Sequence, residues 1–337
     1  MPADAVVSGA RPLRLGVLGA ADIARRRTLP AVAAEPDVEL VAVASRDPHR
    51  ARRCTEVFGG EPMAGYAALL GRADIDAVYL PLPAALHARW IEAALDAGKH
   101  VLAEKPLTIR AADAHRLVAS AAARGLVLAE NYMFALHPQH ACVAELIAAG
   151  MIGEVRGMRA AFTIPPLPAG DIRYRPEVGG GALADVGGYP LRASALLLGE
   201  PLEVIGATLR VDAARGVDLS GAALLSTPAG VISEVTFGME HAYRAGYEVW
   251  GTGGTIRLER AYATPPDHVP VLHLRTRDDV RTRRLEPDDQ FRRAVRAFAA
   301  AVRDGADSGL QGDDILRQAD LVDRVRAVAR RAEITGP

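Results

Sequence analysis

The feature that most constrains the fold is an alternation, from residue 13 to residue 133, between short apolar runs and amphipathic segments. The apolar runs span residues 13–18, 38–44, 77–82, 100–103 and 126–129. They are rich in Val and Leu and apolar on both faces, as expected of parallel strands that helices cover on both sides. The amphipathic segments stop at glycines such as Gly98 and Gly125, which commonly end helices. This βαβ pattern predicts a doubly wound α/β sheet with right-handed crossovers.

The pattern changes beyond about residue 153, where strand-like segments follow one another without intervening helices. These segments span residues 155–164, 203–211, 222–226, 230–237, 247–251, 255–259 and 271–274. Two helices are predicted to close the chain, near 288–304 and 313–331. We therefore expect an α/β domain over residues 13–133, followed by an α+β domain over residues 134–335 with a large, mainly antiparallel open sheet.

Composition excludes several classes of function. The 337-residue chain has 40 Lys and Arg against 41 Asp and Glu, a net charge of −1, which offers no field for nucleic acid or an anionic membrane. No apolar run approaches the roughly 20 residues that span a bilayer, and residues 1–12 do not resemble a signal peptide. Cys54 and Cys142 fall in predicted helices and no Cys/His spacing suits zinc. We expect a cytoplasmic protein without structural disulfides or a metal.

Arginine has almost replaced lysine in this chain, and the two lysines that remain are Lys99 and Lys105. Only an ammonium is compact and has a readily shifted pKa, so a retained lysine is a candidate for a site where a guanidinium would fail. Lys99 lies in a helix-to-strand turn, where retention by chance is an equally good explanation.

A candidate cofactor site begins where the first strand ends. With Gly19 as the tight-turn glycine the fingerprint is G-x-A-x-x-A, with alanine where dinucleotide sites usually carry glycine. Alanine still allows a pyrophosphate to approach, and the helix N-terminus supplies free N–H groups. The motif predicts cofactor contacts at Gly19, Ala20, Ala21, Asp22 and Ile23, and a plain strand–turn–helix is the alternative.

The end of the second strand bears on the choice between NAD and NADP. An NAD site would place a carboxylate here for the ribose 2′-OH, whereas this chain has Ser45 and Arg46, with Arg50 one turn further on. A hydroxyl and guanidinium groups suit a 2′-phosphate. The sequence therefore predicts NADP(H). The alternatives are that these arginines are solvated surface residues or that Asp47 serves NAD.

The fourth predicted strand delivers Glu104 and Lys105 to the carboxyl edge of the sheet, where ligands of such folds bind. Leu82 and His87 follow the third strand and are expected at the same edge. All four are predicted to contribute to the cofactor site. A lysine there could hold a nicotinamide ribose or a substrate hydroxyl.

Several motifs together resemble those of the Gfo/Idh/MocA oxidoreductase family. They are the first turn, the loop 83–87, the stretch 97–106 with its Glu-Lys-Pro block, and the segments 129–133, 179–189 and 251–255. The resemblance spans the chain. It implies a Rossmann domain, an open sheet often used for homo-oligomerisation, and an NAD(P)-dependent oxidoreductase that acts on a sugar or polyol carbon.

Members of the family commonly carry Asp-x-x-x-His on a helix of the second domain, and here Asp185 and Tyr189 have that spacing. Residues four apart share a face of a regular helix. Pro190 works against regularity, although adjacent glycines allow the backbone to bend. A phenol remains a competent acid, and we expect a nearby ammonium to lower its pKa. The alternative is that Tyr189 only packs and Asp185 caps the helix.

Within the family the chain looks most like the sugar 3-ketoreductases of actinomycete deoxysugar pathways. The tyrosine at position 189, the Arg-rich strand end and the segment 131–139 carry this resemblance. It implies reduction by NADPH of the C-3 carbonyl of a nucleotide-linked, dTDP-type deoxysugar. Tyr189 or Lys105 would supply the proton and Asp185 would orient the pair.

Four further residues are assigned to the substrate on the same resemblance. Arg173 and Arg175 offer guanidinium groups for a diphosphate, and Asn131 and Tyr132 are expected to contact the sugar. Two other functions are compatible with the same motifs: dehydrogenation of a free sugar, polyol or dihydrodiol, and a non-catalytic sensor that binds NADP. The retained lysine and the acid–phenol pair argue against the sensor.

Overall fold

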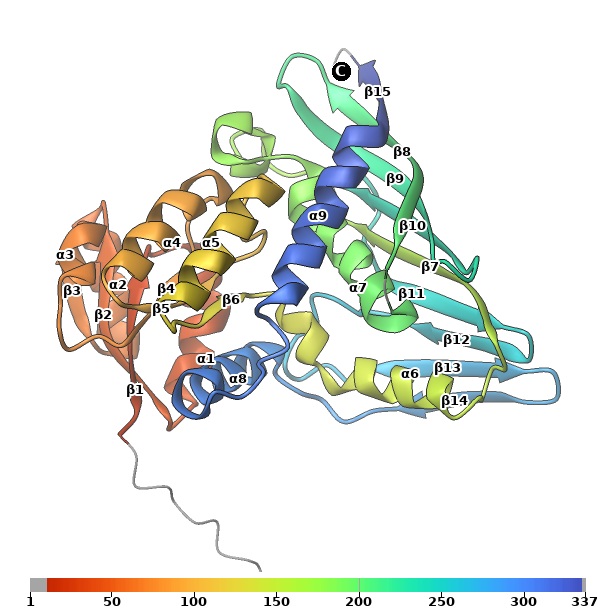
Figure 1. The fold of residues 1–337 in the computed structure, drawn as a ribbon, viewed down its shortest axis with the longest axis horizontal. Coiled ribbons are helices and arrows are strands. Elements are labelled where there is room, and N and C mark those ends of the chain that lie inside the picture. Colours follow the sequence, from red (N-terminus) through yellow and green to blue (C-terminus); the bar gives the residue numbers. More distant parts are fainter. Residues whose placement is uncertain (1–10, 200, 335–337) are drawn as a thin grey trace, which may run out of the picture.

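Two β-sheets of different construction organise the chain (Figure 1). The structure is a computed structural model, and it describes residues 11–199 and 201–334. The first sheet, in red to yellow, and the second, in green to blue, are separate layers that share no strand. This division corresponds to the change of pattern in the sequence.

The first sheet is formed by β1 (Leu13–Leu18), β2 (Val38–Ser45), β3 (Glu61–Ala64), β4 (Ala77–Leu80), β5 (His100–Ala103) and β6 (Leu128–Glu130). Its connecting segments are η1 (Ala24–Thr28, a π-helical turn), α1 (Leu29–Ala33), α2 (Pro48–Phe58), α3 (Tyr66–Leu70), η2 (Ala84–Leu86), α4 (His87–Asp96) and α5 (Ala111–Ala123). The strand order is β3-β2-β1-β4-β5-β6 and every pairing is parallel. This confirms the predicted doubly wound sheet.

Strand β3 is missing from the sequence prediction, for a physical reason. Its four residues include no apolar run, and three of them are exposed. It pairs along the outer edge of β2, from Ala42↔Glu61 to Ser45↔Ala64. An edge strand does not need two apolar faces, so hydrophobic periodicity does not reveal it.

The second sheet is formed by β7 (Val155–Thr163), β8 (Glu203–Asp212), β9 (Val217–Ser226), β10 (Ile232–Gly238), β11 (Arg244–Gly251), β12 (Gly254–Leu258), β13 (Val271–Thr276), β14 (Val280–Arg284) and β15 (Ala329–Ile334). The order is β14-β13-β12-β11-β7-β10-β9-β8-β15. All neighbours are antiparallel except β7 with β10 and β8 with β15. The predicted mainly antiparallel sheet is therefore confirmed.

The remaining helical segments connect or cover this sheet. They are η3 (Met133–Leu136), α6 (Pro138–Ala148), η4 (Ile172–Tyr174), η5 (Pro176–Val178), the π-helical turn η6 (Leu183–Gly187), α7 (Gly188–Leu198), α8 (Gln290–Asp304) and α9 (Asp313–Val328). Helix α7 packs on β7 and β10, and α9 packs on β8. Because α7 lies between β7 and β8 in the chain, the expectation that these strands follow one another without a helix is wrong at this point.

The end of the last helix differs from the prediction, which extended it to residue 331. Helix α9 stops at Val328, and β15 begins at Ala329. Strand β15 adds in parallel to β8, with Ala329 opposite Ala207. Hydrogen bonds to a distant strand decide this ending, and local helix propensity does not contain that information. Strand β14 was likewise missed because all five of its residues are exposed.

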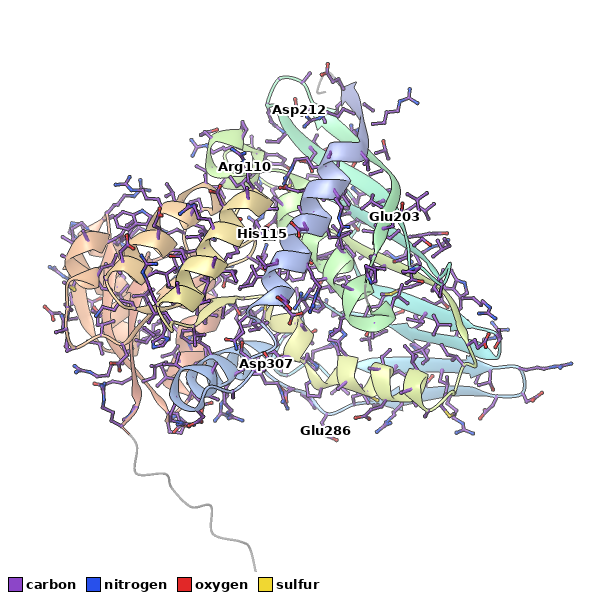
Figure 2. The ribbon with its side chains drawn as sticks, in the orientation of Figure 1. Arg110, His115, Glu203, Asp212, Glu286 and Asp307 are labelled. Atoms are coloured by element: carbon purple, nitrogen blue, oxygen red, sulfur yellow. The ribbon has the colours of Figure 1, made fainter. Side chains whose placement is uncertain are left out.

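The C-terminal helices hold the two parts of the chain together. Helix α8 packs on α1 and η1, and α9 packs on both α5 and α7. Figure 2 shows His115 where α5 faces α9, and its Nε2 lies 2.9 Å from Asp320 Oδ1. Buried Glu35 pairs with Arg292 and Arg296 of α8 at 3.3 and 3.0 Å. These contacts fix how the second sheet faces the carboxyl ends of the first.

Among the described residues, no helix is both long and apolar enough to cross a membrane. Cys54 and Cys142 are free thiols on α2 and α6, so the predicted helical placement of both is confirmed.

Candidate active site

The turn after β1 has the shape of a dinucleotide cradle. Gly19 has φ +123°, and its N–H donates to the Ala44 carbonyl at 2.9 Å. A Cβ at this position would lie 2.8 Å from Leu82 Cδ2. Only glycine fits this conformation and this space. The helix that follows starts at Asp22 and offers its free N–H groups beside the turn.

The segment after β2 carries one carboxylate, which caps a helix, and two exposed guanidinium groups. The Asp47 carboxylate accepts the His49 N–H at 2.9 Å and is the N-cap of α2. Buried Ser45 accepts the Asp47 N–H with its Oγ at 3.2 Å. Arg46 and Arg50 are exposed, and within the described part of the chain neither side chain makes a hydrogen bond or an ion pair. The arginines are therefore available for an anion, whereas Asp47 is committed to its helix.

A chain of buried hydrogen bonds ties the cradle to the end of β5. Thr28 Oγ1 donates to Tyr79 Oη at 2.9 Å, and Tyr79 Oη donates to Glu104 Oε1 at 2.7 Å. Asn131 Nδ2 donates to the same Glu104 oxygen at 2.8 Å. Burial raises the pKa of Glu104 above its usual value. Glu104 thus joins three neighbouring elements at the carboxyl edge of the sheet.

His87, the first residue of α4, is completely buried. Its Nε2 lies 2.7 Å from the Leu82 carbonyl oxygen and its Nδ1 lies 2.9 Å from that of Pro106. Burial lowers the pKa of the ring, which favours the neutral form with a single N–H donor. The ring thus lies between the loops that leave β4 and β5, and its one N–H donates to one of the two carbonyl oxygens.

The centre of the site is an ion cluster between the two sheets. Lys105 Nζ donates to Asp185 Oδ1 at 2.9 Å and to the Asp185 carbonyl at 2.8 Å. Arg173 Nε donates to the other carboxylate oxygen at 2.6 Å. Burial alone would raise the pKa of Asp185, but the charges of Lys105 and Arg173 outweigh burial and lower this pKa to about 2. Asp185 is therefore ionised at every physiological pH.

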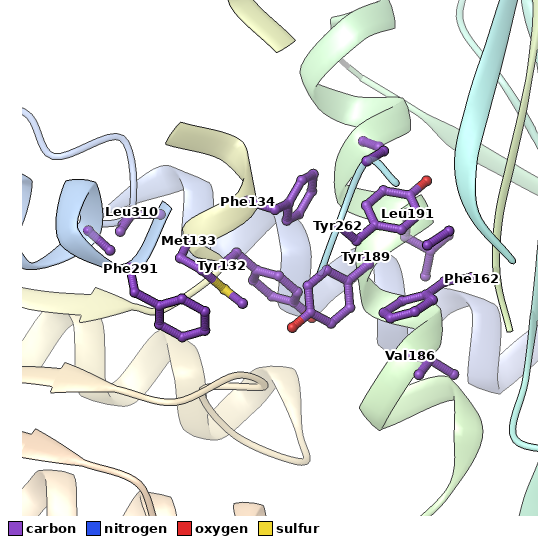
Figure 3. Close-up of a cluster of buried hydrophobic side chains, with 14 of the residues drawn as sticks. Tyr132, Met133, Phe134, Phe162, Val186, Tyr189, Leu191, Tyr262, Phe291 and Leu310 are labelled. Carbon is purple, nitrogen blue, oxygen red and sulfur yellow. The ribbon is translucent and has the colours of Figure 1, made fainter. Parts of the chain in front are cut away.

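Tyr189 lies beside this cluster, and Lys105 Nζ is 5.2 Å from the centre of its ring. The ring packs edge-to-face on Tyr132 and Phe162, with centroids 5.3 and 5.1 Å apart (Figure 3). Burial raises the pKa of Tyr189 well above its usual value, and the carboxylates of Glu104 and Asp185 raise it further. The expectation that the ammonium lowers this pKa is therefore wrong, because burial outweighs it. Tyr189 keeps its proton at neutral pH.

The backbone between Asp185 and Tyr189 accommodates Pro190 without a regular helix through both residues. Residues Leu183–Gly187 form a π-helical turn, and the regular helix α7 starts at Gly188. The wider turn needs no hydrogen bond from Pro190, which lies within the first turn of α7. Asp185 and Tyr189 still approach the same ammonium.

The residues predicted to contact substrate have different surroundings. Asn131 and Tyr132 are only 1% and 2% exposed, and Tyr132 Oη accepts a hydrogen bond from Gln318 at 3.4 Å. Asn131 donates to Glu104 and the Tyr132 ring packs on Tyr189. Direct contact of either residue with a sugar stays a prediction. Arg173 belongs to the ion cluster, whereas exposed Arg175 pairs with Glu177 at 3.6 Å. The structure thus brings Arg173 but not Arg175 to the Lys105 centre.

Tyr79 and Glu130 are part of this region and are absent from the sequence prediction. Tyr79 carries a hydroxyl within a strand whose four residues are all buried. A buried hydroxyl needs a hydrogen-bond partner. A tyrosine in an otherwise apolar strand was therefore the sequence signal that could have identified Tyr79. Glu130 is a carboxylate at the buried end of β6 and accepts the Leu107 N–H. Nothing local in the sequence indicates that partner.

Among the described residues, no group of three or more His, Cys, Asp or Glu side chains lies close enough to hold a metal ion.

Two protein families match the chain. The family described as "Oxidoreductase family, NAD-binding Rossmann fold" matches residues 13–132, and the "GFO/IDH/MocA C-terminal domain" matches residues 140–257. Together they cover most of both sheets.

Individual relatives match over almost the full length. The dTDP-3,4-didehydro-2,6-dideoxy-alpha-D-glucose 3-reductase of Actinomadura kijaniata is 54% identical over 323 residues, which cover 96% of this chain and 97% of that protein. An enzyme of the same name from Streptomyces violaceoruber is 55% identical, with coverage of 96% and 97%. The D-xylose 1-dehydrogenase (NADP(+)) 2 of Haloferax volcanii is 36% identical and covers 87% of this chain and 90% of its own.

A solved structure has the same fold. KijD10, a 3-ketoreductase from Actinomadura kijaniata in complex with NADP and TDP-benzene, superposes with a TM-score of 0.94 at 53% identity. The match covers 96% of this chain and all of that one.

Proposed function

The chain belongs to the GFO/IDH/MocA family of oxidoreductases, and on that premise we propose that it is an NADPH-dependent sugar 3-ketoreductase. Its substrate is a dTDP-linked 2,6-dideoxy sugar with a carbonyl at C-3, the class named for the relatives that are 54% and 55% identical. The observation that carries the proposal is the ammonium of Lys105, held on Asp185 and 5.2 Å from the centre of the Tyr189 ring. Cation and phenol together suit the reduction of a carbonyl.

The residues present fit NADP. The tight turn at Gly19 and the free N–H groups of the helix that follows suit a pyrophosphate, and the unpaired side chains of Arg46 and Arg50 suit a 2′-phosphate. When bound, NADPH supplies the hydride for the carbonyl carbon. Glu104, Leu82 and the other residues of this edge then lie on the nicotinamide side of the site.

Residues of the chain stabilise the negative charge on the carbonyl oxygen and supply its proton. Negative charge develops there during reduction, and the Lys105 ammonium stabilises it. Tyr189 retains its proton at neutral pH because of its burial, so its Oη donates that proton to the oxygen. Asp185 holds Lys105 in place. Lys105 itself is the second candidate donor.

Substrate recognition and assembly complete the proposal. Arg173 binds the diphosphate near the ion cluster, and Arg175 extends the positive surface towards the nucleotide. The domain of residues 13–133 carries the cofactor, and that of residues 134–335 carries the substrate and a homo-oligomer contact. Ile205 and Leu224, exposed on neighbouring strands of the second sheet, support such a contact. The compartment in this proposal is the cytoplasm.

The test follows NADPH oxidation at 340 nm with the dTDP-linked 3,4-diketo-2,6-dideoxyglucose, prepared enzymatically. We expect turnover with NADPH and a product carrying a C-3 hydroxyl, identified by mass spectrometry and NMR. Reduction of NADP⁺ by free D-xylose or another free sugar, without turnover of the dTDP-sugar, would assign the chain to the dehydrogenases instead. Binding of NADP without turnover of any sugar would indicate the sensor.

A further inference from the structure

The second peptide unit after Lys105, between Pro106 and Leu107, is contacted at both ends by buried side chains. The carbonyl oxygen of Pro106 lies 2.9 Å from His87 Nδ1. The N–H of Leu107 donates to Glu130 Oε1 at 2.6 Å. This carbonyl and this N–H belong to the same amide, so His87 and Glu130 hold one rigid plane between them.

The two side chains come from different elements and are both shielded from water. His87 opens α4 and is 0% exposed, and Glu130 ends β6 and is 5% exposed. Burial of an ionisable group is unfavourable unless its hydrogen bonds are well placed. Neither group touches the ion cluster of Lys105, Asp185 and Arg173 directly. Their partner is the backbone that carries Lys105.

The clamp also reaches the cofactor turn and the second sheet. The other ring nitrogen of His87 lies 2.7 Å from the carbonyl oxygen of Leu82, whose side chain fills the space beside Gly19. On the opposite side, Glu130 lies in the field of Lys105 and of buried Arg192 on α7. Arg192 is itself held by Asp314 of α9 at 3.0 Å.

We propose that His87 and Glu130 are positioning residues that clamp the Pro106–Leu107 peptide and so fix the direction of Lys105. This inference rests on the proposed function, since it is Lys105 that meets the carbonyl oxygen. A shift of about 1 Å in a reacting group can lower a rate by roughly 100-fold. The hydrogen bond from the Leu107 N–H to Glu130 and, in the tautomer with the proton on Nδ1, that from His87 to the Pro106 carbonyl oppose such a shift two residues from Lys105.

The variants separate the hydrogen bond from the charge. Glu130→Leu removes the acceptor of the Leu107 N–H and keeps a side chain of similar size. Glu130→Gln keeps a carbonyl oxygen as acceptor and removes the charge. His87→Phe keeps a ring and removes both contacts to carbonyl oxygens.

We expect Glu130→Leu and His87→Phe to lower kcat by about 10- to 100-fold, with the KM of the dTDP-sugar within about threefold of wild type. Glu130→Gln should restore kcat to within about threefold of wild type. Hydrogen–deuterium exchange at the Leu107 amide should accelerate in Glu130→Leu and remain slow in Glu130→Gln.

The matched control is Lys99→Met, which removes another buried polar clamp of the same domain. Lys99 Nζ donates to the carbonyls of Arg72 and Ile75, both at 2.8 Å. This variant should lose stability and keep its kcat. A loss of kcat equal to that of Glu130→Leu would show a general effect of destabilisation and overturn the clamp.

Two further results would also overturn it. One is wild-type kcat in both Glu130→Leu and His87→Phe. The other is unchanged exchange of the Leu107 amide in Glu130→Leu, a result that does not depend on turnover. If the wild-type protein reduces no keto sugar while this exchange responds as expected, the proposed reductase fails and the clamp of the peptide stands.

Discussion

The two lysines of this chain flank the same strand and have opposite surroundings. Lys99 precedes β5 and donates to two backbone carbonyls, with 8% of the residue exposed. Lys105 follows β5 and donates to the carboxylate of Asp185 in η6, the π-helical turn that packs on β10 of the second sheet. At the amino end of the strand the ammonium closes a loop, whereas at the carboxyl end it faces the region between the sheets. Position along a parallel strand thus separates a lysine with a structural role from the lysine that we propose to act on the substrate.

The comparison gives a physical reason for the presence of a lysine at position 99, which composition alone does not explain. The sequence offered a choice between function and chance retention. The structure shows a cation buried on the carbonyls of Arg72 and Ile75, where a compact ammonium fits between two loop carbonyls. Two retained lysines therefore have two different causes.

The strongest test of this contrast is Lys105→Met. We expect kcat to fall about 10²- to 10⁴-fold, because the variant loses the cation at the carbonyl oxygen and the neighbour of Tyr189. Steady-state NADPH oxidation measures the loss, and circular dichroism confirms folding. A kcat near wild type would remove Lys105 from the chemistry and make the two lysines equivalent.

The variant Tyr189→Phe tests whether the phenol donates a proton at the carboxyl end of the first sheet. We expect kcat to fall about 100-fold, since a proton donor is lost while the aromatic packing on Tyr132 and Phe162 is kept. The dissociation constant of NADPH, measured by fluorescence, should remain within about threefold of wild type because the phenol is not a cofactor ligand. Loss of cofactor binding would contradict this assignment.

How much of this contrast the sequence predicts depends on the range of the interactions. The strands β1 and β5, the Gly19 turn and the candidate Lys105 follow from local patterns. The pair Asp185 and Tyr189 follows from the resemblance to the family. The role of Glu130 requires knowing that β6 lies beside β5, and the hydrogen bond of Tyr79 to Glu104 requires β4 beside β5. Strand order is a long-range property, so periodicity does not contain it.

The ion cluster illustrates the same limit at the level of charge. The motif places Asp185, but the sequence does not indicate that Arg173 shares its carboxylate with Lys105. Nor does it show that burial dominates the pKa of Tyr189. Both facts depend on how the second sheet is oriented against the first.

Lys99→Met is the counterpart at the amino end. Methionine leaves the carbonyls of Arg72 and Ile75 without a donor, which should lower the free energy of unfolding by about 1–3 kcal/mol. Urea unfolding followed by fluorescence measures this change, and kcat should stay at the wild-type value. If Lys105→Met destabilises the fold as much as Lys99→Met does, the division between the two ends is wrong.

Arg46→Ala extends the comparison to the end of β2, another carboxyl edge of the same sheet. The guanidinium group has no protein partner among the described residues, so its removal should act on the cofactor alone. We expect the ratio of kcat/KM for NADPH to that for NADH to fall about tenfold. An unchanged ratio would mean that Arg46 is an ordinary surface residue and that the preference for NADP lies elsewhere.

A pH dependence of stability is also expected from Glu130. Burial raises the pKa of its carboxyl to about 7 in the folded protein, against the opposing charges of Arg192 and Lys105, whereas the unfolded chain has a pKa near 4.5. Between these values the folded state binds the extra proton, so this group makes stability fall as pH rises, by at most about 1.4 kcal/mol per unit. Above pH 7 the loss is complete.

Glu130→Gln does not titrate and should remove this slope. Urea unfolding of wild type and variant at pH 5 and pH 8 measures the difference. We expect the variant to gain stability relative to wild type at pH 8 and to lose that gain at pH 5. Asp185 acts with the opposite sign, since its pKa of about 2 makes its stabilising effect fade only in strong acid, outside this window. Equal slopes for both proteins would show that Glu130 is ionised throughout, and its hydrogen bond to Leu107 would then be that of a permanent carboxylate.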